Sequence, residues 1–292
     1  MPSLSASPSF EQYRPHLWAI AYRMLGSSAE ADDIVQEAYL RARAVPAEDV
    51  TSERAYLSSI VTRLCLDHWK SARVRRESYV GPWLPEPVVT EQPANPESIS
   101  LAFLVLLESL TPLERAAYLL SEVFDYSHAE VARIVGRDEA ACRQLLHRAR
   151  ERVVAQRPRF APSRDRHREL LAGFATACAM GDLAGLERLL ADDVTSYGDG
   201  GGKVHAAKRP VIGAAKVARL YCGLFKKAPA NASVEIAEIN GLPAIVVRID
   251  GTVVGIVDIE TDGVRILSVR SVANPDKLAA LITPALPSGA FD

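Results

Sequence analysis

The stretch SHAEVARIVGRDEAACRQLLHRARER, residues 127–152, carries the strongest structural signal in the chain. Ser127 with Glu130 three residues later is typical of a helix start, and the apolar pattern that follows stops at Gly136. Asp138 then precedes a longer helical pattern. A short helix, a glycine turn and a longer helix predict a helix-turn-helix unit.

The second helix of this unit presents polar side chains away from its apolar stripe. In helix-turn-helix units that helix enters the major groove, where arginine pairs with guanine and glutamine with adenine. An ordinary helical hairpin with a basic surface is the alternative, but arginines on its outer face without matching acids are uncommon. The sequence therefore predicts DNA binding by Arg143, Gln144, His147, Arg148 and Arg150.

The net charge of −2 conceals three charged blocks. Residues 26–53 hold seven acids and two arginines, a balance of −5. Residues 63–76 hold five basic residues against one acid, and residues 137–159 hold seven arginines against three acids, so each balance is +4. These blocks fit a protein that holds a protein partner and a polyanion together. Solvated helix faces are the alternative, and charge alone leaves both open.

Apolar residues at three- and four-residue spacing predict helices over the first ~160 residues. Ser27 with Glu30 forms a capping-box pattern at one further helix start, and Thr111 begins another. Asn95-Pro96 marks the expected start of a fourth helix, which precedes the one that begins at Thr111.

The helix expected after Ser52 runs into a basic segment. Its cationic side chains are expected to neutralise DNA phosphates, and Trp69 or Tyr79 is a candidate for stacking on exposed bases. A basic helix end also satisfies the helix dipole, and Trp69 fits a core position better than a base platform. The candidate phosphate-binding residues are Arg63, Lys70, Arg73, Arg75 and Arg76.

Residues 79–96 differ in composition from both flanks. Prolines recur too often for a regular helix or a central strand, which predicts an extended, semi-stiff linker. A pure spacer has no use for a large aromatic side chain, so Trp83 is expected to dock on another part of the chain.

A third module is expected after Pro162. Helical patterns cover about 165–180, 182–190 and 214–226, with a glycine loop after the second. Turn signals at Asn240-Gly241, Asp250-Gly251 and Asp262-Gly263 separate strands near 233–239, 243–249, 252–259 and 264–272. Helices followed by an antiparallel meander predict an α+β domain.

The helical segments resemble RNA polymerase sigma factors. Residues 32–39 resemble the helix that binds core RNA polymerase, which implies that role for Asp32, Asp33, Gln36 and Glu37. Residues 56–76 resemble the part that reads and melts the promoter −10 element, and residues 99–156 resemble the part that reads the −35 element. With only a linker between them, the two regions resemble the extracytoplasmic-function class. Arg63 departs from the asparagine that many members have.

The last ~130 residues resemble the SnoaL-like cone fold, which one group of these sigma factors carries as an extension. Three motifs support this resemblance: Trp83-Leu84-Pro85-Glu86-Pro87, Asp199-Gly200-Gly201-Gly202-Lys203 and Asn274-Pro275-Asp276-Lys277-Leu278. The resemblance implies regulation of the sigma core by the extension, and we expect the cone to dock on the linker. A plain hairpin turn, or an anion-binding nest without a following helix cap, would also explain the glycine loop.

The expected fold is two all-α sigma domains, the second with a helix-turn-helix, followed by an α+β cone with a curved antiparallel sheet. The expected boundaries are 1–78 for region 2, 79–96 for the linker, 97–158 for region 4, 163–284 for the SnoaL-like domain and 285–292 for a tail.

The predicted function is promoter-specific transcription initiation with core RNA polymerase and the −35 and −10 elements as partners. The alternative is a one-component DNA-binding regulator whose cone binds a small ligand or retains cyclase- or isomerase-like activity, but such a regulator has no need of an acidic helix. His205, Asp193 and Asp258 are candidates for proton transfer without telling spacing, so no enzyme is expected. A small-molecule ligand of the cone stays open.

The four cysteines are well separated and the apolar runs are short, which bears on metal binding, membrane insertion and location. The cysteines have no metal or redox spacing, so neither a metal nor a cofactor is expected. The apolar runs are too short for a membrane span, and Met1 to Ser9 lack a signal-peptide pattern. The expected location is the cytoplasm.

Overall fold

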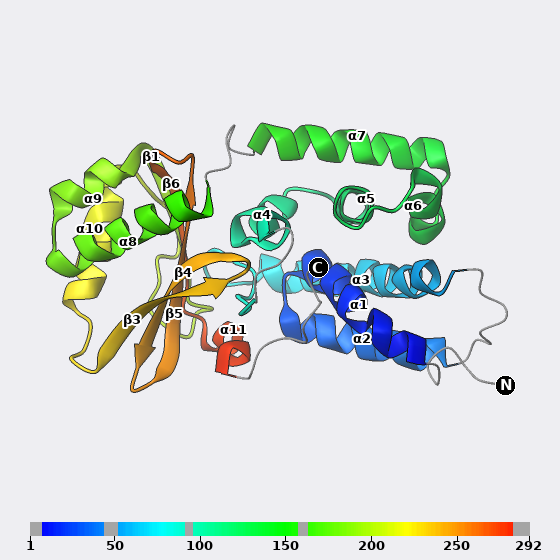
Figure 1. Cartoon of the computed structure of the whole chain (residues 1–292), viewed down its shortest axis with the longest axis horizontal. Helices are drawn as coiled ribbons and strands as arrows, with labels where there is room; N and C mark the ends of the chain where they lie inside the picture. Colours follow the sequence, from blue (N-terminus) through cyan, green and yellow to red (C-terminus); the bar gives the residue numbers. More distant parts are fainter. Residues whose placement is uncertain (1–7, 44–51, 91–95, 157–162, 283–292) are drawn as a thin grey trace.

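The computed structural model describes residues 8–43, 52–90, 96–156 and 163–282. The side chains of 8, 9, 70–77, 96, 97, 156, 280 and 282 are outside this description. Helices occupy one end of the molecule and an α+β domain the other, with the linker between them (Figure 1). Among the described residues, no helix is both long enough and apolar enough to cross a bilayer.

The N-terminal unit consists of α1 (Pro8–Leu25), α2 (Ser28–Ala42) and α3 (Glu53–Glu77). The three-four spacing of α1 buries Leu17, Ile20 and Met24 against the other two helices. Gly26 adopts a φ of 70°, which lets the chain turn sharply from α1 into α2.

The second helical unit follows the linker. It contains η2 (Pro96–Ile99), α4 (Leu101–Leu107), α5 (Pro112–Tyr118), the π-helical turn η3 (Leu119–Val123), α6 (His128–Val135) and α7 (Glu139–Gln156). Capping boxes at Thr111 and Ser127 are present, so both predicted helix starts are confirmed. With Gly136 left-handed between them, α6 and α7 form the predicted helix-turn-helix.

The helix start predicted at Asn95-Pro96 is wrong. Residues Pro96–Ile99 form a short 3-10 turn, and α4 begins after Ser100, whose hydroxyl accepts the Phe103 N–H at 3.2 Å. Asn95 itself lies outside the described residues.

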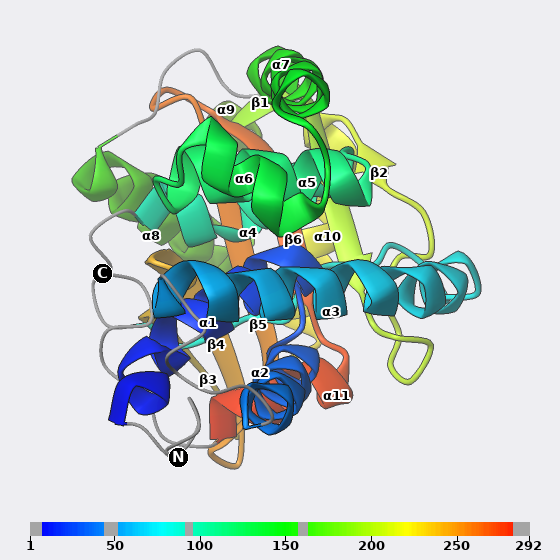
Figure 2. The same ribbon diagram turned by 90° about the vertical axis from the view of Figure 1, so that its right-hand side faces the viewer.

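The two helical units share one apolar core. It runs from Phe10 in α1 to Val153 in α7 without a break between the units, because α3 packs directly on α6 (Figure 2). Trp69 is 8% exposed in this core and donates to the Met24 carbonyl at 2.9 Å. Its interpretation as a core residue is therefore confirmed.

The C-terminal domain (residues 163–282) combines three helices with one sheet. The helices are α8 (Arg164–Met180), α9 (Leu183–Leu189) and α10 (Ala214–Lys226); the strands are β1 (Leu190–Asp199), β2 (Val211–Ile212), β3 (Ala232–Ile239), β4 (Leu242–Ile249), β5 (Thr252–Thr261) and β6 (Ile266–Val272); α11 (Pro275–Leu278) and η4 (Ala279–Ile282) follow. The four predicted strands form the predicted antiparallel meander.

The predicted curved antiparallel sheet is present, but it is extended by one parallel pair. The strand order is β2-β1-β6-β5-β4-β3, and β1 pairs with β6 in parallel, so the sheet is mixed. The strand β1 was not predicted, because it follows α9 directly and carries the exposed pair Asp192-Asp193 near its start. Its partner lies more than 60 residues away, where no local pattern points to it.

The sheet positions the linker because both of its faces are covered. Helices α8 and α10 pack on one face (Figure 1). The other face receives Leu84 of the linker, Val105 of α4 and Leu278 of α11. An open sheet face would expose its apolar side chains, so burial of this face favours docking of the helical units on the C-terminal domain.

Candidate functional site

Asp199, at the end of β1, holds the linker against the C-terminal domain. Its fully buried carboxylate accepts hydrogen bonds from the Tyr79 hydroxyl at 2.5 Å and the Leu84 N–H at 2.8 Å. Lys277 forms an ion pair with the same carboxylate at 2.7 Å, which compensates the buried charge. Burial, and then the Asp199 carboxylate, raise the pKa of Tyr79, so its hydroxyl stays protonated and donates.

The three sequence motifs meet around this carboxylate, as expected for a cone docked on the linker. Lys277 also donates to the Leu84 carbonyl, and its ammonium lies 4.2 Å from the centre of the Trp83 ring. The Asn274 amide donates to the Tyr79 hydroxyl at 2.8 Å. Of the other motif residues, Pro85, Pro87 and Leu278 are buried, while Pro275 and Asp276 are exposed.

Close backbone approaches explain two glycines at this site. A Cβ on Gly201 would lie 2.4 Å from the Asn274 amide nitrogen, and a Cβ on Gly26 would lie 2.7 Å from the Trp83 ring. Trp83 is therefore docked between the α1–α2 turn and Lys277. Beside this contact, Lys203 pairs with the exposed Asp276 at 2.6 Å.

Glu86 of the linker caps the N-terminus of α2. Its carboxylate accepts from the Ser27 hydroxyl at 2.8 Å and from the Ser28 N–H at 2.7 Å. Ser27 caps α2 as predicted, but Glu30 does not complete the capping box. Glu30 instead pairs with His68 of α3 at 3.1 Å, because Glu86 already occupies the helix start.

Asn240 joins the C-terminal domain to three other parts of the chain, and sequence reasoning missed it. Its side-chain oxygen accepts from the Val88 N–H of the linker at 3.0 Å. Its side-chain nitrogen donates to the Tyr22 hydroxyl of α1 at 2.7 Å and to the Ile99 carbonyl of η2 at 2.9 Å. The residue is 1% exposed and left-handed, with a φ of 51°. The only sequence signal was Asn240-Gly241, read as a hairpin turn.

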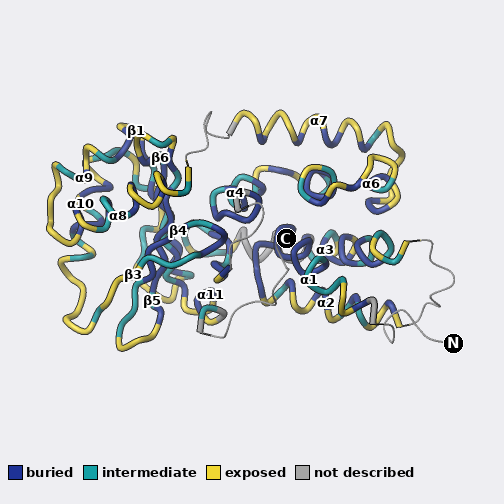
Figure 3. The backbone as a smooth tube through the Cα atoms, in the orientation of Figure 1, coloured by how far each residue is buried: buried dark blue, intermediate teal, exposed yellow. Residues whose placement is uncertain are grey.

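The residues expected to bind polymerase lie on one surface of α2. Asp32, Asp33 and Gln36 are exposed, and Glu37 is partly exposed beside Arg41, with an ion pair at 2.9 Å. Leu40 next to them is 52% exposed. This face of α2 is therefore an acidic surface that also exposes the apolar Leu40, and Figure 3 marks the exposed positions of the helix in yellow.

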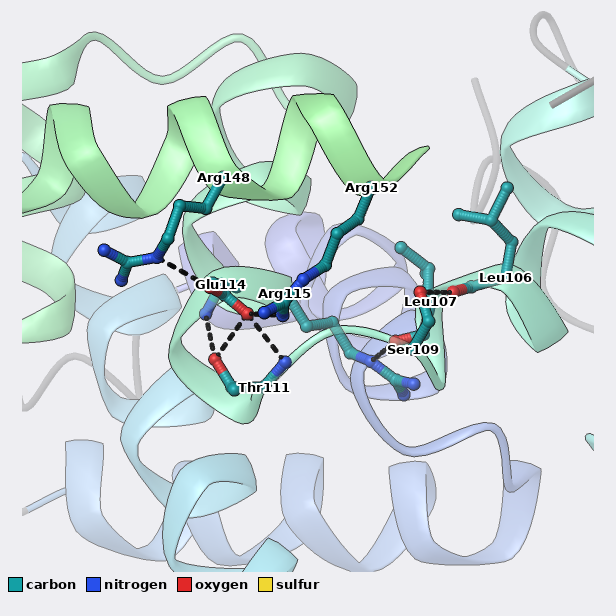
Figure 4. A network of polar contacts seen from close by, with 8 residues as sticks. All are labelled: Leu106, Leu107, Ser109, Thr111, Glu114, Arg115, Arg148 and Arg152. Atoms are coloured by element: carbon teal, nitrogen blue, oxygen red, sulfur yellow. Dashed lines mark hydrogen bonds and ion pairs between the residues drawn. The ribbon is translucent and has the colours of Figure 1, made fainter. Parts of the chain in front are cut away.

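Two arginines of α7 share a buried carboxylate (Figure 4). Glu114 of α5 is 2% exposed. Its carboxylate accepts hydrogen bonds from the Arg148 Nε at 3.0 Å and from the Arg152 Nη1 at 2.5 Å. Burial would raise the pKa of Glu114, but hydrogen bonds from Thr111 and Arg148 hold it below its usual value. The contact uses the Nε of Arg148, and half of that side chain stays exposed, which leaves its outer guanidinium edge facing solvent.

The expectation that the outer arginines of α7 lack matching acids is wrong. Arg150 pairs with Glu122 of η3 at 2.7 Å, besides the two arginines on Glu114. The acids come from a neighbouring helix and turn, so the local charge balance of α7 did not include them. Within α7, Arg143 lies 3.6 Å from Glu139 and His147 lies 3.4 Å from Glu151. Gln144 is exposed on the same helix.

The structure places Arg63 against the second helical unit. Its guanidinium donates to the Arg133 and Ile134 carbonyls at the end of α6, at 3.3 and 3.4 Å, where a cation stabilises a helix C-terminus. The side chains of Lys70, Arg73, Arg75 and Arg76, expected on phosphates, lie outside the described residues.

Arg115 joins the two helical units from within their shared core. It is 1% exposed and donates to the Met24 carbonyl of α1 at 2.7 Å and to the Leu107 carbonyl at 3.1 Å. Its guanidinium also lies over the Trp69 ring and pairs with Glu108 at 2.7 Å. Because the charge is almost fully enclosed, separation of the two units would have to rehydrate it.

The candidate proton-transfer residues are not brought together. Asp258 is 3% exposed and paired with Arg270 at 2.9 Å on the sheet face that packs on the linker. His205 is exposed in the glycine loop, and Asp193 is exposed on β1. In the described part of the chain, no three histidine, cysteine or acidic side chains gather as a metal site would require.

The chain matches two protein-family models. Residues 9–75 match Sigma-70 region 2, and residues 100–153 match Sigma-70, region 4. The first match covers α1 to α3, and the second runs from α4 to α7.

Similar proteins cover the C-terminal domain as well. The chain is 43% identical over 227 residues to the ECF RNA polymerase sigma factor SigJ of Mycobacterium tuberculosis, covering 75% of this chain and 72% of that protein. It is 30% identical over 284 residues to the probable ECF RNA polymerase sigma factor SigI of the same species, covering 94% and 95%. The crystal structure of SigJ superposes with a TM-score of 0.74 at 36% identity, covering 93% of this chain and 98% of that one.

Proposed function

The chain belongs to the extracytoplasmic-function RNA polymerase sigma factors, and from this premise we propose that its SnoaL-like C-terminal domain holds the two helical units closed, and so restrains the binding of both core polymerase and promoter DNA in cis. As a sigma factor the protein binds core RNA polymerase and promoter DNA and directs transcription initiation at specific promoters. A sigma factor works by binding polymerase and DNA. Its activity can therefore be regulated by a change in how its two helical units are arranged.

The arrangement observed here holds the two units that read the promoter elements in direct contact. The −35 and −10 elements lie ~25 base pairs apart, which is a separation of roughly 85 Å along B-form DNA. In this structure α3 of region 2 contacts α6 of region 4 directly, through Arg63 among others. Reading both elements therefore requires the two helical units to separate.

The single observation that carries the proposal is the side chain of Asn240. It bonds the linker, α1 and η2 at the same time, so its bonds require the closed arrangement of both helical units. Tethering supplies an effective concentration on the order of millimolar, so a few hydrogen bonds are enough to bias two arrangements.

Replacement of Asn240 tests this restraint. Asn240→Ala leaves the buried Val88 N–H and Ile99 carbonyl without their partner, at a cost of about 1–3 kcal/mol for each group. We expect tighter binding to core polymerase and higher run-off transcription. Asp250→Ala is the matched control, because Asp250 is also left-handed, in an exposed turn of the same sheet. Equal transcription by the parent and both variants would overturn the restraint.

We further propose that the exposed acidic face of α2 binds core polymerase. Asp33 and Glu37 lie on this face, and neither contacts the C-terminal domain in the described contacts. Charge reversal at both positions should abolish co-purification with polymerase, while the circular dichroism spectrum stays that of the parent. Normal co-purification of the double variant would assign polymerase binding to another surface.

A further inference from the structure

A cavity separates the start of the linker from the glycine loop of the C-terminal domain. It encloses about 510 Å³, a volume typical of small-molecule sites. Val80 and Gly81 of the linker form one wall, and Gly198, Gly200 and residues 202–208 form the rest. The cavity adjoins the Asp199 contact, so it lies where the linker is held.

The lining of this cavity is basic. Lys203, His205 and Lys208 line it, and no aspartate or glutamate does. His205 and Lys208 are exposed, and their described contacts include no acidic partner. Lys203 pairs with Asp276, but both side chains are more than half exposed, so this pair is weak. The lining therefore favours an anionic occupant.

Glycines bring the backbone to the cavity surface. Gly198, Gly200 and Gly202 line it without side chains. A Cβ on Gly200 would lie 2.5 Å from the Val204 carbonyl oxygen, and a Cβ on Gly202 would lie 3.2 Å from Val80. Within the described residues, the N–H groups of Gly202 and His205 donate to no protein group. Backbone N–H groups in glycine loops are common donors to phosphate oxygens.

We propose that this cavity binds a small anion that carries a phosphate group. Two lysines and free backbone N–H groups match the several oxygen acceptors of a phosphate better than a single carboxylate. The inference rests on the proposed restraint in one respect. A ligand that contacts both the linker wall and the loop wall binds the docked arrangement preferentially, so it strengthens the restraint.

Calorimetry on the full chain tests the site itself. The probes are inorganic phosphate, pyrophosphate and ADP, each compared with sodium chloride at equal ionic strength. We expect at least one probe to bind the parent, and Lys208→Ala to weaken it tenfold or more. Lys216→Ala is the matched control, because Lys216 is an exposed lysine of α10 away from the cavity. No binding by any probe, or equal binding by all three proteins, would overturn the site.

Competition with core polymerase tests the regulatory link. The probe that binds should lower the affinity of the parent for polymerase and leave the affinity of Lys208→Ala unchanged. Asn240→Ala should bind polymerase tightly with or without the probe. Binding by calorimetry without an effect on polymerase affinity would overturn the link and keep the site. Parent-like affinity of Asn240→Ala would instead indicate that the restraint itself fails.

Discussion

Glu114 connects the N-terminus of α5 to two arginines of α7. Its carboxylate accepts from the Thr111 N–H at 3.0 Å as well as from Arg148 and Arg152. A glutamine at this position keeps the shape but loses the charge that both guanidiniums contact. Charge-assisted hydrogen bonds are about twice as strong as neutral ones, so the loss should be measurable.

We therefore expect Glu114→Gln to lower the free energy of unfolding by about 1–3 kcal/mol, measured by urea denaturation. Glu122→Gln is the control, because Glu122 is 31% exposed where it pairs with Arg150, and it should cost under about 1 kcal/mol. If Glu114→Gln and Glu122→Gln lose equal stability, the buried charge of Glu114 does not stabilise the fold more than an exposed ion pair does.

Local spacing predicted two of the three capping boxes, and the third is replaced by a contact that is distant in sequence. The capping boxes at Thr111 and Ser127 are local patterns and are present. Glu86 caps a helix that begins 58 residues earlier, and no spacing rule points to it. Asn240 looks the same in sequence whether its side chain faces solvent or bonds three segments.

At the scale of elements, α7 and α3 are expected to contact DNA differently. Gln144 and Arg148 are exposed on α7, and the outer guanidinium edge of Arg148 is directed by its Nε contact with Glu114. Alanine at either position should cost about 1–3 kcal/mol at one base pair of the −35 element and relax specificity there. Arg73→Ala, in the basic end of α3, should weaken binding across all sequences and reduce the salt dependence.

Binding titrations with single-base promoter variants at several salt concentrations separate these outcomes. Val154→Ala provides a reference on α7, because Val154 is an exposed residue of this helix that is not among the predicted DNA contacts. A uniform loss across all promoter variants from every substitution would remove the claim that α7 reads bases.

In the sheet, too, the strands joined by short turns were predicted, and the strand that pairs with a partner distant in sequence was not. Each hairpin of the meander from β3 to β6 has a turn signal of two residues, so all four strands were predicted. The parallel pairing of β1 with β6 has no turn, and only the assembled layers of sheet and helices bring these strands together.

At the scale of the whole molecule, the sequence indicated two helical domains but not the core that they share. The apolar faces of α3 and α6 satisfy the patterns of separate domains and of one merged core equally well. Besides this apolar core, polar contacts between residues distant in sequence join the two units: Arg115 on Met24, and Asn240 on Tyr22 and Ile99. The closed arrangement is therefore a property of the assembled chain.

A partly buried histidine is expected to make this closure sensitive to pH. His16 of α1 lies between the units, and its Nε2 contacts the Tyr126 hydroxyl at 3.0 Å and the Arg54 Nε at 3.4 Å. Arginine can only donate, so the Nε2 must be unprotonated in the closed arrangement. Burial, then Arg54 and Arg23, lower the pKa of His16 to about 4.

The unfolded chain therefore binds a proton that the folded chain excludes between pH 6.5 and about 4. Stability from this site is complete above pH 6.5 and is lost as the pH falls through that window. From pH 7.5 to 5.0 the parent should lose up to about 2 kcal/mol in urea denaturation beyond the loss shown by His16→Gln. His128→Gln is the control, because His128 is exposed at the start of α6 and should keep the pH dependence of the parent. If His16→Gln shows the same pH dependence as the parent and the control, His16 is not the group whose protonation opposes closure, and the contact with Arg54 contributes nothing specific to the neutral ring.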